Sequence, residues 1–524
     1  MAMRGKRWLF LAHRWLGVGL GVLFVMWFVS GVVMMYVGYP KLTEAERLQH
    51  LPALEAEQPL LAPAQALRAA GLGGPLKDLR LAVASGGRAV YLATPLPPAA
   101  HSGRGRARSA GSRPVVIDAA SGQPLRGTDT AWALASAAAY AGGPAGLRHL
   151  GTVEEDAFTH SRALDAHRPL HRVARADTDG TWLYVSSQTG EVVRDASRAE
   201  RAWNFAGAWI HWLYPLRGNV FDPYWADIVN ALSLLGIAGA LSGTVAGVLR
   251  WRFARPYRSG ARSPYAPGAM RWHHVCGLLF ALSTCTWIFS GLMSMNPWRL
   301  FDSGAPPLRL QAVQGGPLQV SGQDATPAAL LAAAGPGVRE LRWTRVLGRT
   351  VVAAASAAPA VGQPALLDAR TAQPYRVDPA QLRVAAAGLL PAPVLRIEPL
   401  TRYDLHYYVR APHTMTGGAD KPLPVWRVVF GDAHATWVHI DPRTGAVLGR
   451  TDSHRRASRW LFAMLHSWDW LPLLERRPLW DIALIAASLG GTALSLTGVV
   501  IGWRRLRVKL RRPVRPAVSR PASA

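Results

Sequence analysis

Residues 13–31 read HRWLGVGLGVLFVMWFVSG, and residues 273–291 read HHVCGLLFALSTCTWIFSG. Five residues recur at identical spacing in the two stretches: His13, Gly17, Trp27, Ser30 and Gly31 match His273, Gly277, Trp287, Ser290 and Gly291. Each copy begins with a histidine and continues as a long apolar run. Histidine is costly inside lipid and is the commonest side-chain metal ligand. A duplicated apolar helix with a duplicated histidine therefore indicates a cofactor held between two helices.

Four apolar segments are long enough to cross a membrane, which takes about 20 residues. They cover approximately residues 15–36, 228–249, 275–295 and 482–501. No small-residue cleavage site precedes Tyr36, so we expect the first span to be a retained anchor and not a cleaved signal peptide. Both cysteines, Cys276 and Cys285, fall in the third span, which predicts no disulfide framework for the polar regions between the spans.

The net charge of +27 is concentrated in three segments that contain no acid, residues 1–14, 250–271 and 504–524. Basic segments flank membrane spans on the cytoplasmic side. The distribution therefore predicts cytoplasmic termini, a cytoplasmic central loop and two large regions outside the membrane. It favours contact with anionic membrane lipid and argues against nucleic acid as a partner.

The duplication continues beyond the first spans. His211 precedes the second span in the stretch AWIHWL, residues 208–213, and His466 precedes the fourth in AMLHSW, residues 463–468. In the polar regions, strand-like runs surround Thr-Gly turns at 189–190 and 444–445, which is typical of β-hairpins. Each polar region therefore looks like two small α+β units.

The expected organisation is a membrane protein of four transmembrane α-helices in two parallel repeats, with two periplasmic α+β regions. The boundaries that we expect are a cytoplasmic N-terminus at 1–14, spans at 15–37, 227–250, 273–296 and 481–503, periplasmic regions at 38–205 and 297–458, interfacial segments at 206–226 and 459–480, a basic cytoplasmic loop at 251–272 and a basic cytoplasmic tail at 504–524.

Several of these motifs resemble those of the PepSY-associated transmembrane-helix family. The resemblance is carried by His13-Arg14-Trp15-Leu16-Gly17, the Thr-Gly hairpins, Arg459-Trp460-Leu461 leading to His466, Pro478-Leu479-Trp480-Asp481, and Gly498. The family includes iron-regulated inner-membrane proteins and ferrisiderophore reductases that carry two haems between four helices. The resemblance thus implies PepSY-like outer regions, a multi-pass protein of the bacterial inner membrane, and a role in iron metabolism.

Topology places the four repeated histidines at two depths. His13 and His273 begin spans that run outward, whereas His211 and His466 precede spans that run inward. A two-fold axis along the membrane normal would relate parallel halves, bringing together the first two histidines near the cytoplasmic face and the other two near the outer face. Each pair could provide the axial ligands of one haem iron. In a hydrocarbon core about 30 Å thick the pairs would be roughly 20 Å apart.

Some choices stay open at this level. His274 neighbours His273 and could ligate in its place, because one helical residue changes the direction by about 100°. Ser30 and Ser290 fit either a hydrogen bond to a ligand or helix packing.

The chain has no C-x-x-C-H attachment motif, so any haem would be non-covalent haem b. It has neither a G-x-G-x-x-G motif nor a Walker loop, so the electron donor would be a quinol or a separate cytoplasmic reductase. By resemblance, the acceptor is ferric iron in a siderophore. The function that we expect is di-haem electron transfer across the inner membrane, with possible transmembrane ferric reductase activity. The alternative is a non-enzymatic PepSY-type membrane protein that binds a ligand or partner in iron uptake or regulation.

Overall fold

The computed structural model describes residues 2–96, 113–357 and 365–510. Most of the expected basic tail, residues 511–524, lies outside the described residues. The chain divides into two compact units. The helical unit comprises residues 1–36, 206–302 and 454–524, and the strand-rich unit comprises residues 37–205 and 303–453. Each unit therefore combines segments from both halves of the sequence.

The helical unit is built on α1 (Ala2–Tyr36), α6 (Trp225–Arg250), α7 (Ala269–Leu279), α8 (Ala281–Ser294) and α14 (Leu479–Leu510). Among the described residues, α1, α6 and α14 are long and apolar enough to cross a membrane, and α7 with α8 makes a fourth span if the two count as one. The segment expected to be a single third span is bent by 69° between α7 and α8. Its counterpart in the first half, α1, is one continuous helix.

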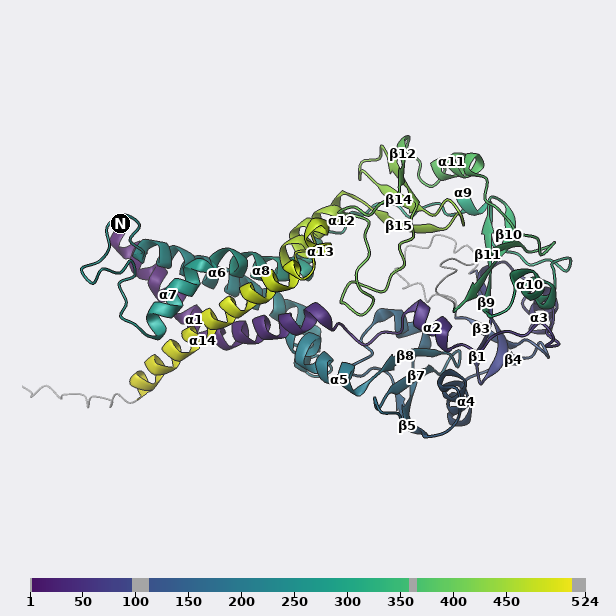
Figure 1. Ribbon diagram of the computed structural model, residues 1–524, viewed down its shortest axis with the longest axis horizontal. Coiled ribbons are helices and arrows are strands. Elements are labelled where there is room, and N and C mark those ends of the chain that lie inside the picture. Colours follow the sequence, from purple (N-terminus) through teal and green to yellow (C-terminus); the bar gives the residue numbers. More distant parts are fainter. Residues whose placement is uncertain (1, 97–112, 358–364, 511–524) are drawn as a thin grey trace, which may run out of the picture. The chain divides into compact units, whose positions relative to one another are not determined.

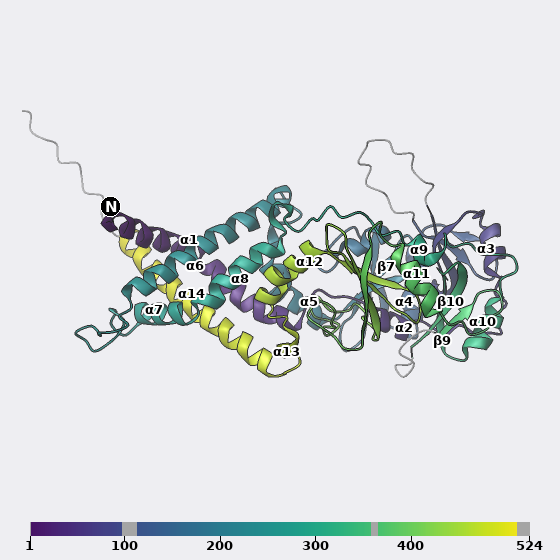
Figure 2. The same ribbon diagram turned by 90° about the horizontal axis from the view of Figure 1, so that it is seen from above.

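Each span packs against two others in the helical unit. The helix α1 lies between α6 and α14, while α7 packs mainly against α14 and α8 against α6 (Figures 1 and 2). Glycines on α6 and α14 accept large side chains from these neighbours. A Cβ at Gly236 would lie 3.1 Å from Ile288, and one at Gly491 would overlap the ring of Phe28. Small residues of this kind let apolar helices approach closely where lipid offers no hydrophobic driving force.

The strand-rich unit contains one seven-stranded antiparallel sheet, in the order β11-β10-β9-β1-β2-β3-β4. Its strands are β1 (Leu76–Ser85), β2 (Arg88–Pro95), β3 (Val115–Asp118), β4 (Pro124–Leu125), β9 (Val338–Val346), β10 (Arg349–Ser356) and β11 (Ala365–Asp368). Strands from the two polar regions meet where β1 pairs with β9, with Leu81 opposite Leu341. The first α+β units of the two regions are thus one continuous sheet, because pairing covers an edge that each would otherwise expose.

A buried ion-pair network crosses the same seam. Arg80 on β1 lies 3.2 Å from Glu191 and 3.4 Å from Glu340 on β9, and Arg47 lies 2.7 Å from Glu340. Burial alone would raise the pKa of Glu191, but the nearby charge of Arg80 outweighs it, and the pKa of Glu191 lies below its ordinary value. Charges from both polar regions therefore stabilise the shared sheet.

Two further four-stranded antiparallel sheets complete this unit. One contains β5 (Leu147–Val153), β6 (Leu170–Arg175), β7 (Trp182–Ser186) and β8 (Val192–Ala196), and the other contains β12 (Val394–Leu400), β13 (Val425–Phe430), β14 (Trp437–Ile440) and β15 (Val447–Thr451). The helix α4 (Thr130–Ala141) packs on the first, and α11 (Pro379–Ala387) shares an apolar core with the second. The Thr-Gly turns read from the sequence join β7 to β8 and β14 to β15.

Candidate site: two histidine pairs in the helical unit

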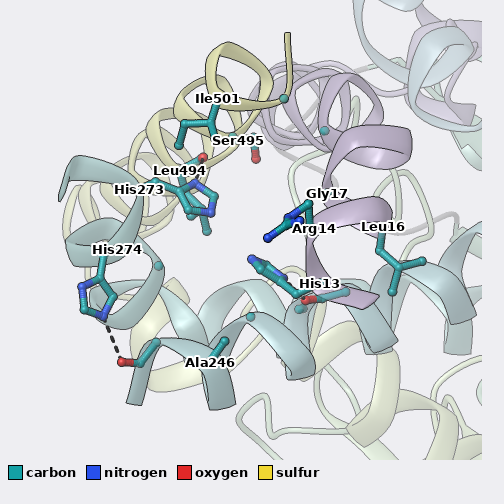
Figure 3. A pocket seen from close by; sticks show the side chains of 18 of the residues that line it. His13, Arg14, Leu16, Gly17, Ala246, His273, His274, Leu494, Ser495 and Ile501 are labelled. Carbon is teal, nitrogen blue, oxygen red and sulfur yellow. Dashed lines mark hydrogen bonds between the residues drawn. The ribbon is translucent and has the colours of Figure 1, made fainter. Parts of the chain in front are cut away.

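The first histidine pair lies between α1 and α7. The ring centroids of His13 and His273 are 6.1 Å apart, with an angle of 34° between the ring planes. Figure 3 shows the two rings reaching toward one another from helices on opposite sides of a cavity. The cavity has a volume of about 420 Å³. That size falls within the range of roughly 300–1,000 Å³ that is typical of small-molecule and cofactor sites. We call His13 and His273 the inner pair.

The second pair lies in the segments that precede α6 and α14. The ring centroids of His211 and His466 are also 6.1 Å apart, with the ring planes at 73°. We call these two residues the outer pair. It is well separated from the inner pair, because Ser30, which contacts His211, follows His13 by 17 residues on the same continuous helix. At 1.5 Å per residue this is about 25 Å along the axis.

Matching backbone features place the two outer histidines. Each follows a π-helical turn, Phe205–Trp209 before His211 and Arg459–Met464 before His466. Two residues later the chain adopts a left-handed conformation at a residue other than glycine, with φ of 54° at Leu213 and 47° at Trp468. Both features depart from regular α-helical geometry, and such departures are concentrated at functional sites.

The Nδ1 atoms of the inner pair are held by backbone carbonyls. His13 Nδ1 lies 3.1 Å from the carbonyl oxygen of Gly239, and His273 Nδ1 lies 3.0 Å from that of Leu494. A carbonyl oxygen can only accept, so each Nδ1 carries the proton and donates it. The lone pair of each inner histidine is therefore on Nε2.

Serine hydroxyls hold the outer pair in the same tautomer. Ser30 Oγ lies 2.9 Å from His211 Nδ1, and Ser290 Oγ lies 3.0 Å from His466 Nδ1. Each hydroxyl donates its own proton to a carbonyl of its helix, that of Met26 in the first case and that of Trp287 in the second. Each serine oxygen therefore accepts from Nδ1, and Nε2 again keeps the lone pair. Hydrogen bonding of the second ring nitrogen is the usual support of a metal-ligating histidine.

The spacing within each pair fits two imidazoles bound to one metal ion. A metal–imidazole bond is about 2 Å long, and the nitrogen lies about 1 Å from its ring centre, so opposed axial ligands have centroids about 6 Å apart. Within residues 2–96, 113–357 and 365–510, no three His, Cys, Asp or Glu side chains group as ligands of a bare metal ion. Two lone histidines therefore suit a metal whose remaining ligands come from a macrocycle.

His274 differs from its neighbour. Its Nδ1 lies 2.8 Å from Ser263 Oγ, and its Nε2 lies 2.9 Å from the carbonyl oxygen of Gly247, the bond dashed in Figure 3. Both ring nitrogens of His274 are thus hydrogen-bonded to other residues of the chain. This geometry favours His273 over His274 as the residue that faces His13.

Glycines give the histidine rings their space. A Cβ at Gly243 would overlap Cε1 of His13 and lie 2.8 Å from its Nδ1, and one at Gly498 would lie 3.2 Å from Cε1 of His273. The carbonyls of Gly239 and Leu494 stand one helical turn before these glycines. Ser242-Gly243 in one half corresponds to Thr497-Gly498 in the other, and this repeat is the sequence feature that could have predicted the glycine contacts. The sequence does not show which carbonyl oxygens the histidines contact.

Residues 10–363 match the family model described as the PepSY-associated TM region. The chain belongs to the PepSY-associated transmembrane family. Together with its long apolar helices, this makes it a membrane protein. The family match includes His13, His211 and His273 and ends before His466. No curated protein matches the chain.

Proposed function

We propose that this PepSY-associated membrane protein binds one haem b at each histidine pair and passes electrons across the bacterial inner membrane to ferric siderophore iron. The observation that carries the proposal is the shared geometry of the pairs, each with centroids 6.1 Å apart. The proposal is also supported by the hydrogen bonds of all four Nδ1 atoms, because these bonds leave each Nε2 free to ligate a metal. When bound at both levels, haem would supply one-electron transfer.

The charge distribution supports the proposed orientation. Residues 250–271 and the ends of α1 and α14 near the inner pair are basic and free of acids, which supports a cytoplasmic location for this end of the spans. On this proposal residues 38–205 and 297–458 are periplasmic, and the outer pair lies near the outer face of the membrane. A quinol or a cytoplasmic reductase would be the donor. Reduction would release the iron from the siderophore, because hard oxygen chelators hold Fe²⁺ less tightly than the more highly charged Fe³⁺.

The absorption spectrum of the purified full-length chain tests this proposal. After haem-sufficient expression we expect the spectrum of bis-imidazole haem b, with two haems per chain. When the reduced protein is mixed anaerobically with ferrioxamine B, we expect it to reoxidise while a ferrous chelator traps the released iron. A chain without haem would contradict the proposal and leave the non-enzymatic binding protein as the better description. A haem protein that ferrioxamine B does not oxidise would overturn only the assignment of the acceptor.

Replacing Ser30 by alanine should weaken haem binding at the outer pair about 10- to 100-fold, because His211 loses the acceptor that fixes its ring and tautomer. Ser290→Ala should act alike through His466. Haem transfer to apomyoglobin measures the loss. Within the part of the chain that the structure describes, the Ser294 hydroxyl on α8 bonds only a carbonyl of its own helix, so Ser294→Ala is the matched control. Equal haem retention in all three variants would show that the serines merely pack the helices.

A further inference from the structure

Three arginines line the cavity of the inner pair, namely Arg14 on α1, Arg250 at the end of α6, and Arg505 on α14. None of its lining residues, all of which are described, is acidic. Figure 3 shows Arg14 directed toward the space between His13 and His273. A partly enclosed, largely apolar cavity that is lined by three positive charges and no counter-charge is suited to an anionic ligand.

Carboxylates of the helical unit are far from these arginines along the spans. The acids of this unit are Asp222, Asp227, Asp302, Asp469, Glu475 and Asp481. They lie at or beyond the opposite ends of the helices, so none occurs in α1 or in the halves of α6 and α14 that carry the arginines. Among the described residues Arg14 makes neither a hydrogen bond nor an ion pair. The positive charge of the cavity is therefore not compensated by the protein.

The arginines on α6 and α14 stand at equivalent positions relative to the histidines. Arg250 follows Gly243, which contacts His13, by seven residues, and Arg505 follows Gly498, which contacts His273, by the same number. Seven residues are about two helical turns, so both arginines point from the same faces as the glycines and lie about 10 Å further along. Arg250 is held in place by the rings of Phe10 and Tyr265, at 4.7 and 5.8 Å.

The third arginine has no equivalent in the second half. The residue that corresponds to Arg14 there is His274, whose nitrogens bond Ser263 and Gly247. Arg14 therefore adds a positive charge next to His13 that has no match next to His273. An anionic group in the cavity would have its negative edge directed toward the His13 side and toward the basic ends of α6 and α14.

We propose that Arg14, Arg250 and Arg505 bind the two propionate carboxylates of the haem held by His13 and His273. This inference rests on the proposed function. Two carboxylates would pair with three guanidinium groups, which leaves one net positive charge among the groups that line the cavity. The arginines thereby set the rotation of the haem about the His13–His273 axis, which the two imidazoles alone leave free.

The test uses the full-length chain with His211→Ala, so that the inner haem alone is observed. In this background, Arg14→Gln and Arg505→Gln should speed haem transfer to apomyoglobin about 10- to 100-fold, the usual effect of losing a charged hydrogen-bond partner. Arg504 is adjacent and, like Arg505, exposed, but it does not line the cavity, so Arg504→Gln is the matched control. Arg14→Lys, which keeps the charge, should restore part of the retention.

Haem dimethyl ester, which has no propionate charge, makes the test specific. If the arginines act on the carboxylates, the ester should dissociate from the unaltered inner site and from every arginine variant at the same fast rate. Faster loss of both haem and ester from the arginine variants would overturn the proposal in favour of a role in folding. Unchanged haem retention with loss of co-purified anionic lipid would overturn it in favour of lipid phosphate as the anion. An unaltered chain that binds no haem would instead refute the proposed function itself.

Discussion

A chain with His211→Ala is expected to bind one haem where the unaltered chain binds two. The outer pair then keeps only His466, and one imidazole cannot provide both axial ligands. The inner pair should be unaffected, because it lies about 25 Å away along α1. Haem content per chain, measured as the pyridine haemochrome, checks the stoichiometry. The reduced spectrum should retain the bis-imidazole form of the remaining haem.

The other histidines provide the comparison. His13→Ala should remove the inner haem instead, and the combination with His211→Ala should remove both. His274→Gln is the control for the inner pair, because His274 bonds Ser263 and Gly247 and does not face His13. Two haems in the His211→Ala chain, or one in the His274→Gln chain, would show that the ligands have been assigned to the wrong residues.

Gly243→Ala is expected to abolish binding of the inner haem while leaving the outer haem in place. The added methyl group would occupy the position of the His13 ring, overlapping Cε1 and approaching Nδ1 to 2.8 Å. Because alanine is well tolerated in a helix, the effect should come from displacement of His13 and the loss of its bond to Gly239, not from weaker helix formation. Haem content and the spectrum of the remaining haem measure the outcome.

Alanine substitutions at the glycines beside the other histidines should have smaller effects, in the order of their Cβ distances. A Cβ at Gly498 would lie 3.2 Å from His273, so Gly498→Ala should weaken the inner site less than Gly243→Ala. At Gly31 and Gly291 a Cβ would lie 3.7 Å from His211 and His466, an ordinary contact distance. Gly31→Ala and Gly291→Ala should therefore keep both haems. Equal effects at all four positions would point to general loosening of the bundle.

The spacing of residues in the chain was sufficient to predict which histidines approach each other. Identical offsets within two apolar runs predict that His13 meets His273, and the basic segments orient the spans so that His211 meets His466. The structure places each pair at 6.1 Å. These predictions depend on periodicity and on the length of apolar runs, which are local properties of the sequence.

Other features depended on contacts between distant segments. The choice of His273 over His274 follows from Ser263 and Gly247, which lie on other parts of the chain. The bend of 69° between α7 and α8 occurs where Phe280 packs over Gly490 of α14, and nothing in the apolar run itself marks it. The pairing of β1 with β9 joins strands more than 240 residues apart, so two regions that read as separate units form one sheet.

The apolar spans, their expected orientation and the recurrence of histidines that predicts two sites thus follow from the sequence without a structure. The tertiary structure decided the direction of each ring, the carbonyl or hydroxyl that holds its Nδ1, and the glycine that leaves it space. The physical reason is that a ring's orientation is set by acceptors and neighbours on another helix. Which of these it meets depends on the crossing and bending of the whole bundle, and no spacing along a single helix encodes that.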